Sequence, residues 1–596
     1  MDEKIYKYPL HYVRPIRDLR DMMEQSEKLY SDLNGYLLKD PIATRQIAPR
    51  SEEAKHLKVD HSRPFVPVTF GQFFQDVRAF GSAAKAMGVN KQSRVAILAE
   101  TRYEWYVSYL AVVNGLAVVV PLDKELPGNE IVNLMQTAEA DVMLFSNQKK
   151  DVIDAIRDEM PTVKHYVNFD LPDDDSEDLY FWDILEEGQR VRASGDTSYD
   201  TLPIDPDEMH ILLFTSGTTS NPKAVMLSHA NICNNLMGMC SMIYIDEHDT
   251  FLSVLPLHHT YECTCGYLCQ IYRGSCVAVS EGLRYIVQNL REVNATMILV
   301  VPLMLEAFHR GIMRKIKNDP KKLRKFNFGL KLSKFLMKLG IDKRKQIFKE
   351  IHDSFGGRIR LMITGGAAIA PETLEDMQAI GFHCVQGYGL TECAPILALN
   401  RTHYHNERSA GLPLPCVDVE IIDPDEDGIG EIIGRGPNVM LGYFNVDEAT
   451  QRAAIDEEGF FHTGDLGYMD EDQFVIITGR KSNLIVTKNG KNVFPEEIEF
   501  LLVQDPLVQE AVITGKPKGD DVVIHAEIFP ARDEIDKNPE LKGLPLDDER
   551  IHAAMQPVIR RVNEQLVNYK HIRSYDLRTT EFPKTTAKKI KRSKIK

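Results

Sequence analysis

The strongest constraint on the fold is a repeated alternation of short apolar runs with segments of helical spacing. These runs are rich in β-branched residues and lie at 94–100, 115–122, 140–146 and 163–169. Strands that are apolar on both faces are typical of a parallel sheet covered by helices on each side. The sequence therefore predicts an α/β protein whose large N-terminal domain contains mixed sheets packed with helices.

The pattern changes after Gly411, where VDVEIIDPDEDGIGEIIGRG combines short alternating runs with turn signals. A period of two is typical of half-buried strands, so we expect a small β-barrel-like subdomain here. A compact tail with strand and helix patterns follows Gly479. We divide the chain into an extended or partly helical leader at 1–65, a large domain at 66–479, a hinge at 480–482 and a small α+β domain at 483–596.

Bulk properties narrow the class of protein. A chain of 596 residues exceeds the size that one hydrophobic core usually covers. Its net charge of −16 opposes binding to nucleic acid, because no basic field offsets the phosphates. Nine cysteines without a paired framework predict reduced thiols. With no secretory signal at the start and no run of 18 apolar residues, we expect a cytoplasmic protein.

One segment departs from this overall charge. Between Arg310 and Glu350 there are fifteen Lys or Arg residues and three acids, interleaved with Phe and Leu. One interpretation is a solvated helical face above a stripe that packs on the core. The other is a basic amphipathic element that contacts an anionic membrane peripherally. The sequence leaves both open.

A loop rich in hydroxyl groups offers the first chemical signal. The stretch FTSGTTSNPKAVMLSH (214–229) follows an apolar run and ends in a segment of helical spacing. Backbone N–H groups, hydroxyls and a lysine suit a polyphosphate. The loop lacks the second glycine of the GxxxxGK[ST] pattern, and on its own a Ser/Thr-rich loop is more often a turn.

Companion motifs follow this loop in a fixed order. QGYGLTECAP (386–395) offers Thr391 as a donor and Glu392 as a carboxylate suited to Mg²⁺. FHTGDLG (461–467) is expected to place Asp465 in a turn, where it can accept hydrogen bonds from ribose hydroxyls. Arg480 lies in GRKSNLIVTKNGKNVFPEEIE, and PKTTAKKIKR (583–592) ends the chain with lysines.

This ordered set resembles the adenylate-forming superfamily, which includes acyl-CoA synthetases, luciferase-like enzymes and peptide-synthetase adenylation domains. The resemblance covers roughly residues 65 to 592. LPLHHTYE (255–262) looks like the LPLxHxxE signature of the long-chain fatty acyl-CoA synthetase branch. It implies ATP, Mg²⁺ and CoA as cofactors, a carboxylic acid as substrate and a mobile small domain. It also implies two steps, through an acyl-adenylate to a CoA thioester.

The resemblance assigns roles residue by residue. The triphosphate loop would comprise Thr215, Ser216, Gly217, Thr218, Thr219 and Lys223. The adenine site would comprise Gly366, Ala367, Gly387 and Tyr388, with Asp465 and Arg480 at the ribose, Thr391 at the α-phosphate and Glu392 at Mg²⁺. Lys589 would bridge the substrate carboxylate and the α-phosphate, His259 would lie between the acyl and nucleotide sites, and the Gly490 segment would replace Lys589 near CoA.

Several neighbouring residues keep more than one interpretation. Tyr261 and Met304 could line an acyl tunnel or belong to the core. His258 is interpreted as a surface or packing residue. Three cysteines near them fit no common zinc spacing and are interpreted as buried thiols: Cys263, Cys265 and Cys269.

The chain also departs from the family pattern. Ser220 and Ala224 replace glycines of the phosphate loop, Ser482 and Asn483 replace a charged hinge, and Lys588 replaces a glycine. We expect altered rates and domain movement. Two alternatives to a long-chain fatty acid–CoA ligase stay open: a ligase that loads a separate acyl carrier protein, and a degenerate nucleotide-binding relative.

Overall fold

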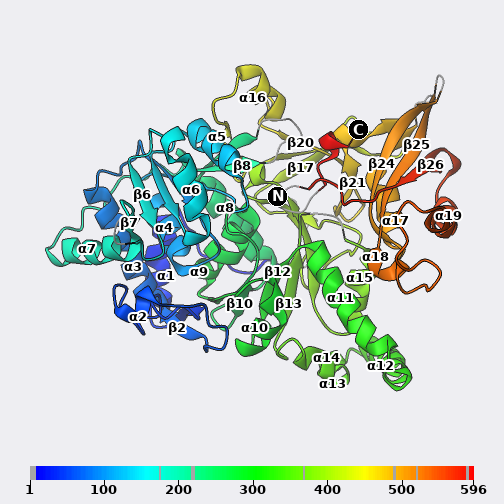
Figure 1. Ribbon diagram of the computed structural model, residues 1–596, viewed down its shortest axis with the longest axis horizontal. Helices are drawn as coiled ribbons and strands as arrows, with labels where there is room; N and C mark the ends of the chain where they lie inside the picture. Colours follow the sequence, from blue (N-terminus) through cyan, green and yellow to red (C-terminus); the bar gives the residue numbers. More distant parts are fainter. Residues whose placement is uncertain are drawn as a thin grey trace.

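The computed structural model describes residues 9–173, 176–215, 222–366, 369–487, 491–518, 521–584 and 590–595. Figure 1 shows a large body formed by the N-terminal four fifths of the chain and a small body, in orange and red, formed by the C-terminal part. The large body is built on two extended sheets with helices packed between and around them. This confirms the predicted α/β class.

The first large sheet has the strand order β19-β9-β8-β4-β3-β5-β6-β7. Its strands are β3 (Arg94–Leu98), β4 (Val118–Pro121), β5 (Val142–Phe145), β6 (His165–Asn168), β7 (Leu179–Tyr180), β8 (Met209–Thr215), β9 (Lys223–Ser228) and β19 (Gly442–Tyr443). The four apolar runs identified in the sequence form β3, β4, β5 and β6, which pair in parallel. The β8–β9 and β9–β19 pairs are antiparallel.

The second large sheet has the order β16-β15-β14-β13-β12-β10-β11-β1-β2. Its strands are β1 (Asn34–Leu38), β2 (Val66–Thr69), β10 (Thr250–Ser253), β11 (Cys276–Val279), β12 (Met297–Val300), β13 (Leu361–Thr364), β14 (Cys384–Gly389), β15 (Ile396–Leu399) and β16 (Leu412–Pro413). From β11 to β14 the neighbouring strands run parallel.

Helices fill the space between these sheets and cover their outer faces. The helices of the large body are α1 (Leu19–Tyr30), α2 (Glu52–Lys55), α3 (Phe70–Ala86), α4 (Tyr103–Val113), α5 (Gly128–Ala138), α6 (Lys150–Ile156), α7 (Phe181–Ala193), α8 (His229–Met242), α9 (Cys269–Arg273), α10 (Ile286–Glu292), α11 (Pro302–Lys317), α12 (Pro320–Lys338), α13 (Arg344–Ile347), α14 (Lys349–Asp353), α15 (Pro371–Ala379) and α16 (Glu448–Ala454). All eleven residues of α4 are buried, and its Tyr106 hydroxyl donates to Ser253 of β10 at 3.0 Å. A helix that is buried on every side belongs inside a core, and α4 lies between the two sheets.

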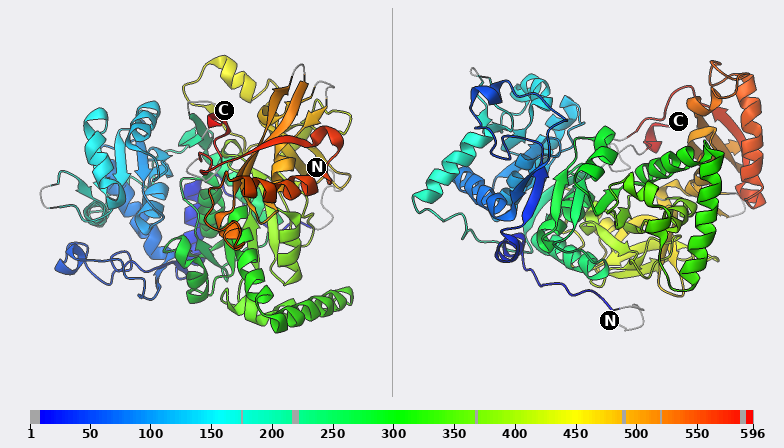
Figure 2. Two further views of the ribbon diagram at one scale, coloured as in Figure 1. Left: turned by 45° about the vertical axis from the view of Figure 1, so that its right-hand side comes forward. Right: turned by 90° about the horizontal axis from the view of Figure 1, so that it is seen from below.

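Two further units complete the chain. The expected β subdomain is a four-stranded antiparallel sheet of β17 (Asp418–Ile422), β18 (Gly430–Arg435), β20 (Phe461–Met469) and β21 (Val475–Arg480). The small body contains α17 (Pro495–Val503), β24 (Val508–Lys518), β25 (Asp521–Pro530), α18 (Arg532–Ile535), α19 (Glu549–Asn563) and β26 (Ile572–Leu577), with a two-stranded ribbon of β22 (Ile485–Val486) and β23 (Asn492–Val493). In the right-hand view of Figure 2 the small body lies to one side of the large one.

The N-terminal segment differs from the expected leader. Leu19, Met22 and Met23 of α1 are buried in the main core, and β1 pairs in parallel with β11 through Tyr36 and Val277. The segment therefore contributes a strand and a helix to the large body. Its polar composition concealed this because only one stripe of α1 and the residues Gly35, Tyr36 and Leu38 of β1 are buried.

Polar contacts fix the hinge between the two bodies. Lys481 Nζ lies 2.6 Å from Glu431 Oε2 on β18, and the Asn483 side chain donates to Glu496 Oε1 on α17 at 2.6 Å. Burial opposes ionisation of Glu431, but the Lys481 hydrogen bond and charge lower its pKa overall. Ser482 therefore lies between one residue held by the large body and one held by the small body.

Across the described ranges, no helix has the length and apolarity that a membrane crossing requires.

The packing of α3 on α7 gives a first prediction. A Cβ at Gly188 would lie 1.8 Å from the Ala79 carbonyl oxygen, whereas a Cβ at Gly311 of α11 would meet nothing within 4 Å. We expect Gly188→Ala to lower the free energy of unfolding by about 2–3 kcal/mol through overpacking. The control Gly311→Ala should be neutral or stabilising by up to about 1 kcal/mol. Urea unfolding followed by fluorescence of Trp105 and Trp182 measures both, and equal effects would contradict the close helix contact.

Candidate active site

A deep cleft of about 5470 Å³ runs between the two large sheets, the β subdomain and the small body. The carboxyl ends of four strands and the segments that follow them line it: Thr215 at the end of β8, Leu255 after β10, Gly365 after β13 and Thr391 after β14. Ligands of open parallel sheets bind at this edge, because loops there converge while helices cover the faces.

The β8–β9 hairpin presents the predicted phosphate loop at this edge. Thr215 and Lys223 are the last and first residues of its strands, they pair in register, and both line the cleft. The loop residues Ser216, Gly217, Thr218, Thr219 and Ser220 lie outside the described residues. Ala224 is a buried residue of β9 and pairs with Phe214, so its side chain fits a strand and strains no left-handed backbone.

A tyrosine that sequence reasoning missed connects the loop to the predicted metal ligand. The Tyr443 hydroxyl donates to Glu392 Oε1 at 2.9 Å, and Lys223 Nζ lies 4.6 Å from the centre of the Tyr443 ring. Burial, and then the Glu392 charge, raise the pKa of Tyr443, so its hydroxyl stays protonated and donates. β19 places Tyr443 beside β9, a pairing with no spacing signal in LGYF.

Asp465 belongs to a second polar group. The Tyr388 hydroxyl donates to Asp465 Oδ2 at 2.7 Å, and Arg480 Nε lies 2.9 Å from Oδ1. Burial, and then Asp465, raise the pKa of Tyr388 well above its ordinary value. The prediction that Asp465 lies in a turn was wrong: it is inside β20 and pairs with Arg480 of β21. The positive φ of Gly464, +68°, is accommodated within the strand, so TGD imitates a turn signal.

The predicted adenine residues lie near this group. Gly366, with a φ of +85°, and Gly387 line the cleft together with Tyr388. A positive φ suits glycine, since a Cβ would strain the backbone there. Ala367 lies outside the described residues.

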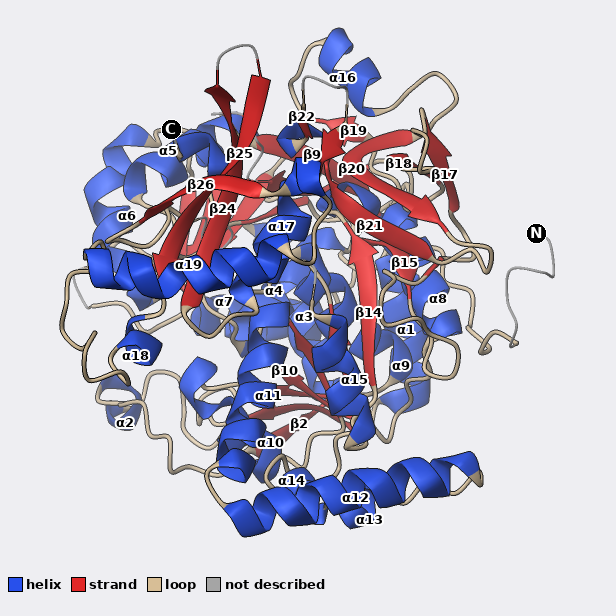
Figure 3. Cartoon of the chain, turned by 90° about the vertical axis from the view of Figure 1, so that its right-hand side faces the viewer, coloured by secondary structure: helices blue, strands red, loops and turns tan. Residues whose placement is uncertain are grey.

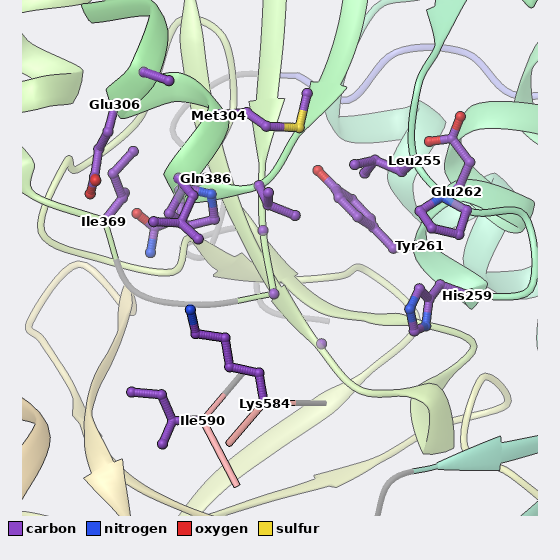
Figure 4. Close-up of a pocket in the computed structure, with 18 of the residues that line it drawn as sticks. Leu255, His259, Tyr261, Glu262, Met304, Glu306, Ile369, Gln386, Lys584 and Ile590 are labelled. Carbon is purple, nitrogen blue, oxygen red and sulfur yellow. The ribbon is translucent and has the colours of Figure 1, made fainter. Parts of the chain in front are cut away.

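Aromatic and apolar side chains form the other end of the cleft. Figure 4 shows Tyr261, Leu255 and Met304 close together, with His259 below them. Tyr261 is held by its hydroxyl, which donates to the Ile363 carbonyl at 3.0 Å. His258 is packed rather than on the surface, with Nε2 3.5 Å from Asp123, and burial followed by the His259 charge lowers its pKa to about 3.

The small body approaches the same cleft through its C-terminal segment. Lys584 and Ile590, both labelled in Figure 4, line the cleft and form an isolated antiparallel bridge. Lys584 forms an ion pair with Glu510, and Arg592 forms one with Glu499. These pairs anchor both ends of the segment that carries Lys589, although Lys588 and Lys589 lie outside the described residues.

The segment predicted to serve the CoA step also borders the cleft. Gly490 is outside the described residues, but the neighbouring Lys491 lines the cleft. Lys491 Nζ lies 3.2 Å from Glu426, and the Asn492 side chain donates to Asp425 at 3.1 Å. Both acids belong to the turn between β17 and β18, so this part of the small body contacts the β subdomain.

A buried carboxyl group lies behind the apolar end of the cleft. Glu262 is 0% exposed, and Ser253 Oγ donates to its Oε1 at 2.5 Å. Its Oε2 is buried with no hydrogen-bond partner among the described residues. Burial raises the pKa of Glu262 to about 8, so the carboxyl is largely neutral at pH 7. Sequence reasoning gave Glu262 only as part of a signature and not as a buried acid.

Nearby thiols do not form a metal centre in the described part of the chain. Cys263, Cys265 and Cys269 are free and buried in the helical turns at 261–273. Among the described residues no group of three or more His, Cys, Asp or Glu side chains is arranged to hold a metal ion.

Fold and site together define an α/β protein with a large body, a small body and a cleft between them. Residues 48–444 match the AMP-binding enzyme family, and residues 482–596 match the AMP-binding enzyme C-terminal domain. The chain therefore belongs to the AMP-binding enzyme family.

Three similar proteins illustrate the range of the family. Long-chain-fatty-acid–CoA ligase 6 of Homo sapiens is 28% identical over 443 residues, which are 71% of this chain but 63% of that protein. A chloroplastic long-chain-fatty-acid–[acyl-carrier-protein] ligase of Arabidopsis thaliana is 25% identical over 525 residues, covering 76% of this chain and 71% of that one. A crystal structure of an anthranilate CoA ligase in complex with anthranoyl-AMP superposes with a TM-score of 0.72 at 20% identity, covering 99% of this chain and 98% of that chain.

The buried acid gives a pH-dependent prediction. The folded-state pKa of Glu262, about 8, exceeds the ordinary value of 4.5, so the folded state binds more protons than the unfolded state between these values. Stability is therefore lost as pH rises through this window, by up to about 1.4 kcal/mol per pH unit. We expect Glu262→Gln to gain stability relative to the wild type from pH 5 to pH 8 in urea unfolding. Equal pH slopes in the two proteins would contradict a neutral Glu262, and the exposed Glu458→Gln variant is the control.

Proposed function

We propose that this protein is an AMP-forming ligase that joins a long-chain fatty acid to CoA. The observation that carries the proposal is one cleft bordered by the phosphate-loop hairpin, the Glu392 and Asp465 groups, an apolar wall and the C-terminal lysine segment. The similarity to long-chain-fatty-acid–CoA ligases supports the substrate class.

In the first step a carboxylate oxygen attacks the α-phosphorus of ATP, and pyrophosphate leaves to give the acyl-adenylate. No protein nucleophile is needed, so the residues act by positioning the reactants and stabilising charge. Thr215 and Lys223 bind the β- and γ-phosphates, and Thr391 binds the α-phosphate. Lys589 bridges the acid and the α-phosphate as a point charge.

The residues at Glu392 fit a magnesium ion. Glu392 lines the cleft with one oxygen already held by Tyr443, which orients the carboxylate. Mg²⁺ commonly binds one or two carboxylates together with substrate phosphates rather than an all-protein cage. When bound, the ion would neutralise charge on the phosphate oxygens.

The ribose and the acyl chain occupy opposite ends of the cleft in this proposal. The Asp465 carboxylate accepts hydrogen bonds from the ribose hydroxyls. Tyr388 and Arg480 fix the orientation of this carboxylate. The acyl chain lies along the wall formed by Leu255, Tyr261 and Met304, with His259 between the two sites.

In the second step the thiolate of CoA attacks the acyl carbonyl, and AMP leaves. The small body turns about Ser482 so that the Gly490 segment replaces Lys589 at the cleft. The presence of both flanking segments, at Lys491 and Ile590, along this cleft supports the exchange.

A carrier protein is the second candidate acceptor. The similarity to an acyl-carrier-protein ligase supports it, and the adenylation step is the same in both cases. Comparing acyl transfer to CoA with transfer to a separate carrier protein decides between the two acceptors.

The adenylation proposal is tested by ATP–pyrophosphate exchange with a panel of fatty acids. We expect exchange in the wild type and a loss of at least about 100-fold in Lys589→Ala, because a charge on the reacting groups is removed. Lys542→Ala, an exposed lysine of the small body, should match the wild type. Absence of exchange in the wild type, with ATP still bound, would favour a degenerate relative and overturn the proposal.

Tyr443 provides a more specific prediction. Tyr443→Phe removes a hydrogen bond to a charged group, so we expect Mg²⁺-dependent adenylation to fall by roughly 10- to 100-fold. The Mg²⁺ concentration needed for half-maximal ATP binding, measured by calorimetry, should rise as well. Tyr468→Phe, on β20 and partly exposed, is the matched control. An unchanged Mg²⁺ requirement would show that Tyr443 does not position Glu392.

A further inference from the structure

Helix α12 has two apolar stripes, and within the described part of the chain only one of them packs against other residues. Phe326 and Leu330 face inward, where the Phe326 ring centre lies 5.5 Å from that of Phe348 and both side chains pack against the second core. Gly329 allows this close approach, since a Cβ there would lie 3.0 Å from Ile347. This stripe fulfils the first interpretation of the 310–350 segment, a helical face that packs on the core.

The second stripe points away from the protein. Phe328 is 68% exposed, Phe335 60% and Leu339, at the end of the helix, 59%, with Leu332 between them at 37%. Their spacing of four, three and four residues places all four within about 60° of one another around the helix. Figure 3 shows α12 along the edge of the molecule with its end projecting beyond α13.

Positive charge surrounds this exposed stripe. Lys321, Arg324 and Lys331 lie within about 70° of its centre. Within the described residues, Lys325 is the α12 side chain that forms an ion pair. Its Nζ lies 3.2 Å from Glu350, and both side chains of this pair are highly exposed. The other cations of α12 are thus uncompensated in the described structure, in a chain whose net charge is −16.

We propose that the exposed face of α12 docks on an anionic lipid surface. Phe and Leu side chains would enter the boundary between headgroups and acyl chains, while Lys321, Arg324 and Lys331 would contact the lipid phosphates. A helix with aromatic and aliphatic residues on one stripe and lysines beside it lies in the plane of such an interface. Each cation near an anionic surface strengthens binding, and the effect declines with salt.

Charge complementarity selects the lipid surface over a second copy of the chain. A symmetric dimer through this stripe would place the same cations of both copies against each other, which is unfavourable. A fluid anionic surface has no such conflict and has no fixed shape to match. The four exposed apolar residues of the stripe are also few compared with the roughly 20–30 residues that each partner contributes to a stable protein interface.

The position of α12 relative to the cleft adds a functional aspect. The first turns of α11 line the cleft with Leu303 and Met304, and the same helix leads directly into α12. Leu303 is 61% exposed at the cleft rim. α11 has 16 residues and is about 24 Å long, so it connects the apolar side of the cleft to the helix that would meet the lipid surface. This aspect rests on the proposed function, whereas lipid docking does not.

The test is co-sedimentation of the full chain with phosphatidylcholine vesicles that contain either no or about 30% phosphatidylglycerol. We expect binding to the anionic vesicles, weakened by salt, and little binding to the neutral ones. A triple variant, Lys321→Gln with Arg324→Gln and Lys331→Gln, should lower the partition coefficient by roughly 100-fold, at about a factor of five per cation. Phe328→Ser with Phe335→Ser should lower it as well.

Matched controls separate docking from loss of folding or of general charge. Three exposed lysines elsewhere, Lys28, Lys91 and Lys542, changed to Gln should leave vesicle binding unchanged. None of the α12 substitutions lines the cleft, so ATP–pyrophosphate exchange in detergent should be retained if the proposed function holds. Failure of exchange in every variant and in the wild type would count against that function and leave the vesicle result standing.

Three outcomes would overturn the docking proposal. They are absence of wild-type binding, equal binding by the control and α12 variants, and equal binding to neutral vesicles. Concentration-dependent dimers that form without vesicles and disappear in Phe328→Ser with Phe335→Ser would assign the stripe to a second copy instead. Circular dichroism and unfolding midpoints equal to those of the wild type would show that the α12 variants fold.

Discussion

The burial of α4 on every side is the constraint on which the rest of the structure depends. Two sheets with parallel centres must each be covered on both faces, and α4 covers an inner face of both at once. This shared layer fixes the two sheets relative to one another, and with them the loops at the carboxyl ends of their strands. The phosphate-loop hairpin comes from one sheet, while Gly366 and Thr391 come from the other. The cleft depends on α4, because this helix, buried on every side, fixes the two sheets and their loops relative to one another.

Within the cleft, two carboxylates are held in the same way. Tyr443 donates to Glu392 and Tyr388 donates to Asp465, with Lys223 and Arg480 as the respective cations. Each tyrosine is buried enough to stay protonated, so it orients an oxygen without adding charge. Such pre-oriented acceptors lose little entropy when a ligand binds. Both groups involve the β14 segment, since Tyr388 lies on the strand and Glu392 directly after it, so this segment sets the spacing between the two carboxylates.

Local signals predicted the elements whose partners are nearby in sequence or follow a simple period. The runs that form β3 to β6 and the alternating β subdomain belong to this class. Tyr443 was missed because its strand pairs with β9 far earlier in the chain, and no spacing encodes that pairing. For the same reason the polar segment containing Tyr36 was expected to lie outside the large domain, although its strand pairs with Val277. Asp465, which its motif selected, lines the cleft, but it was misplaced in a turn, since one glycine at positive φ can occur within a strand. Lys589 and Gly490 lie outside the described residues, so their roles stay predictions.

The hinge contacts have a mechanical consequence. Lys481 is tied to the large body and Asn483 to the small body, which leaves Ser482 as the one residue between the two ties. A residue contributes two soft backbone torsions, so a rotation confined to Ser482 changes only its φ and ψ and limits the relative orientations of the two bodies. The small, uncharged Ser482 side chain adds neither bulk nor an electrostatic preference for one of these orientations. In the proposed turn of the small body, the end positions are therefore set by the surfaces that the small body meets and not by Ser482.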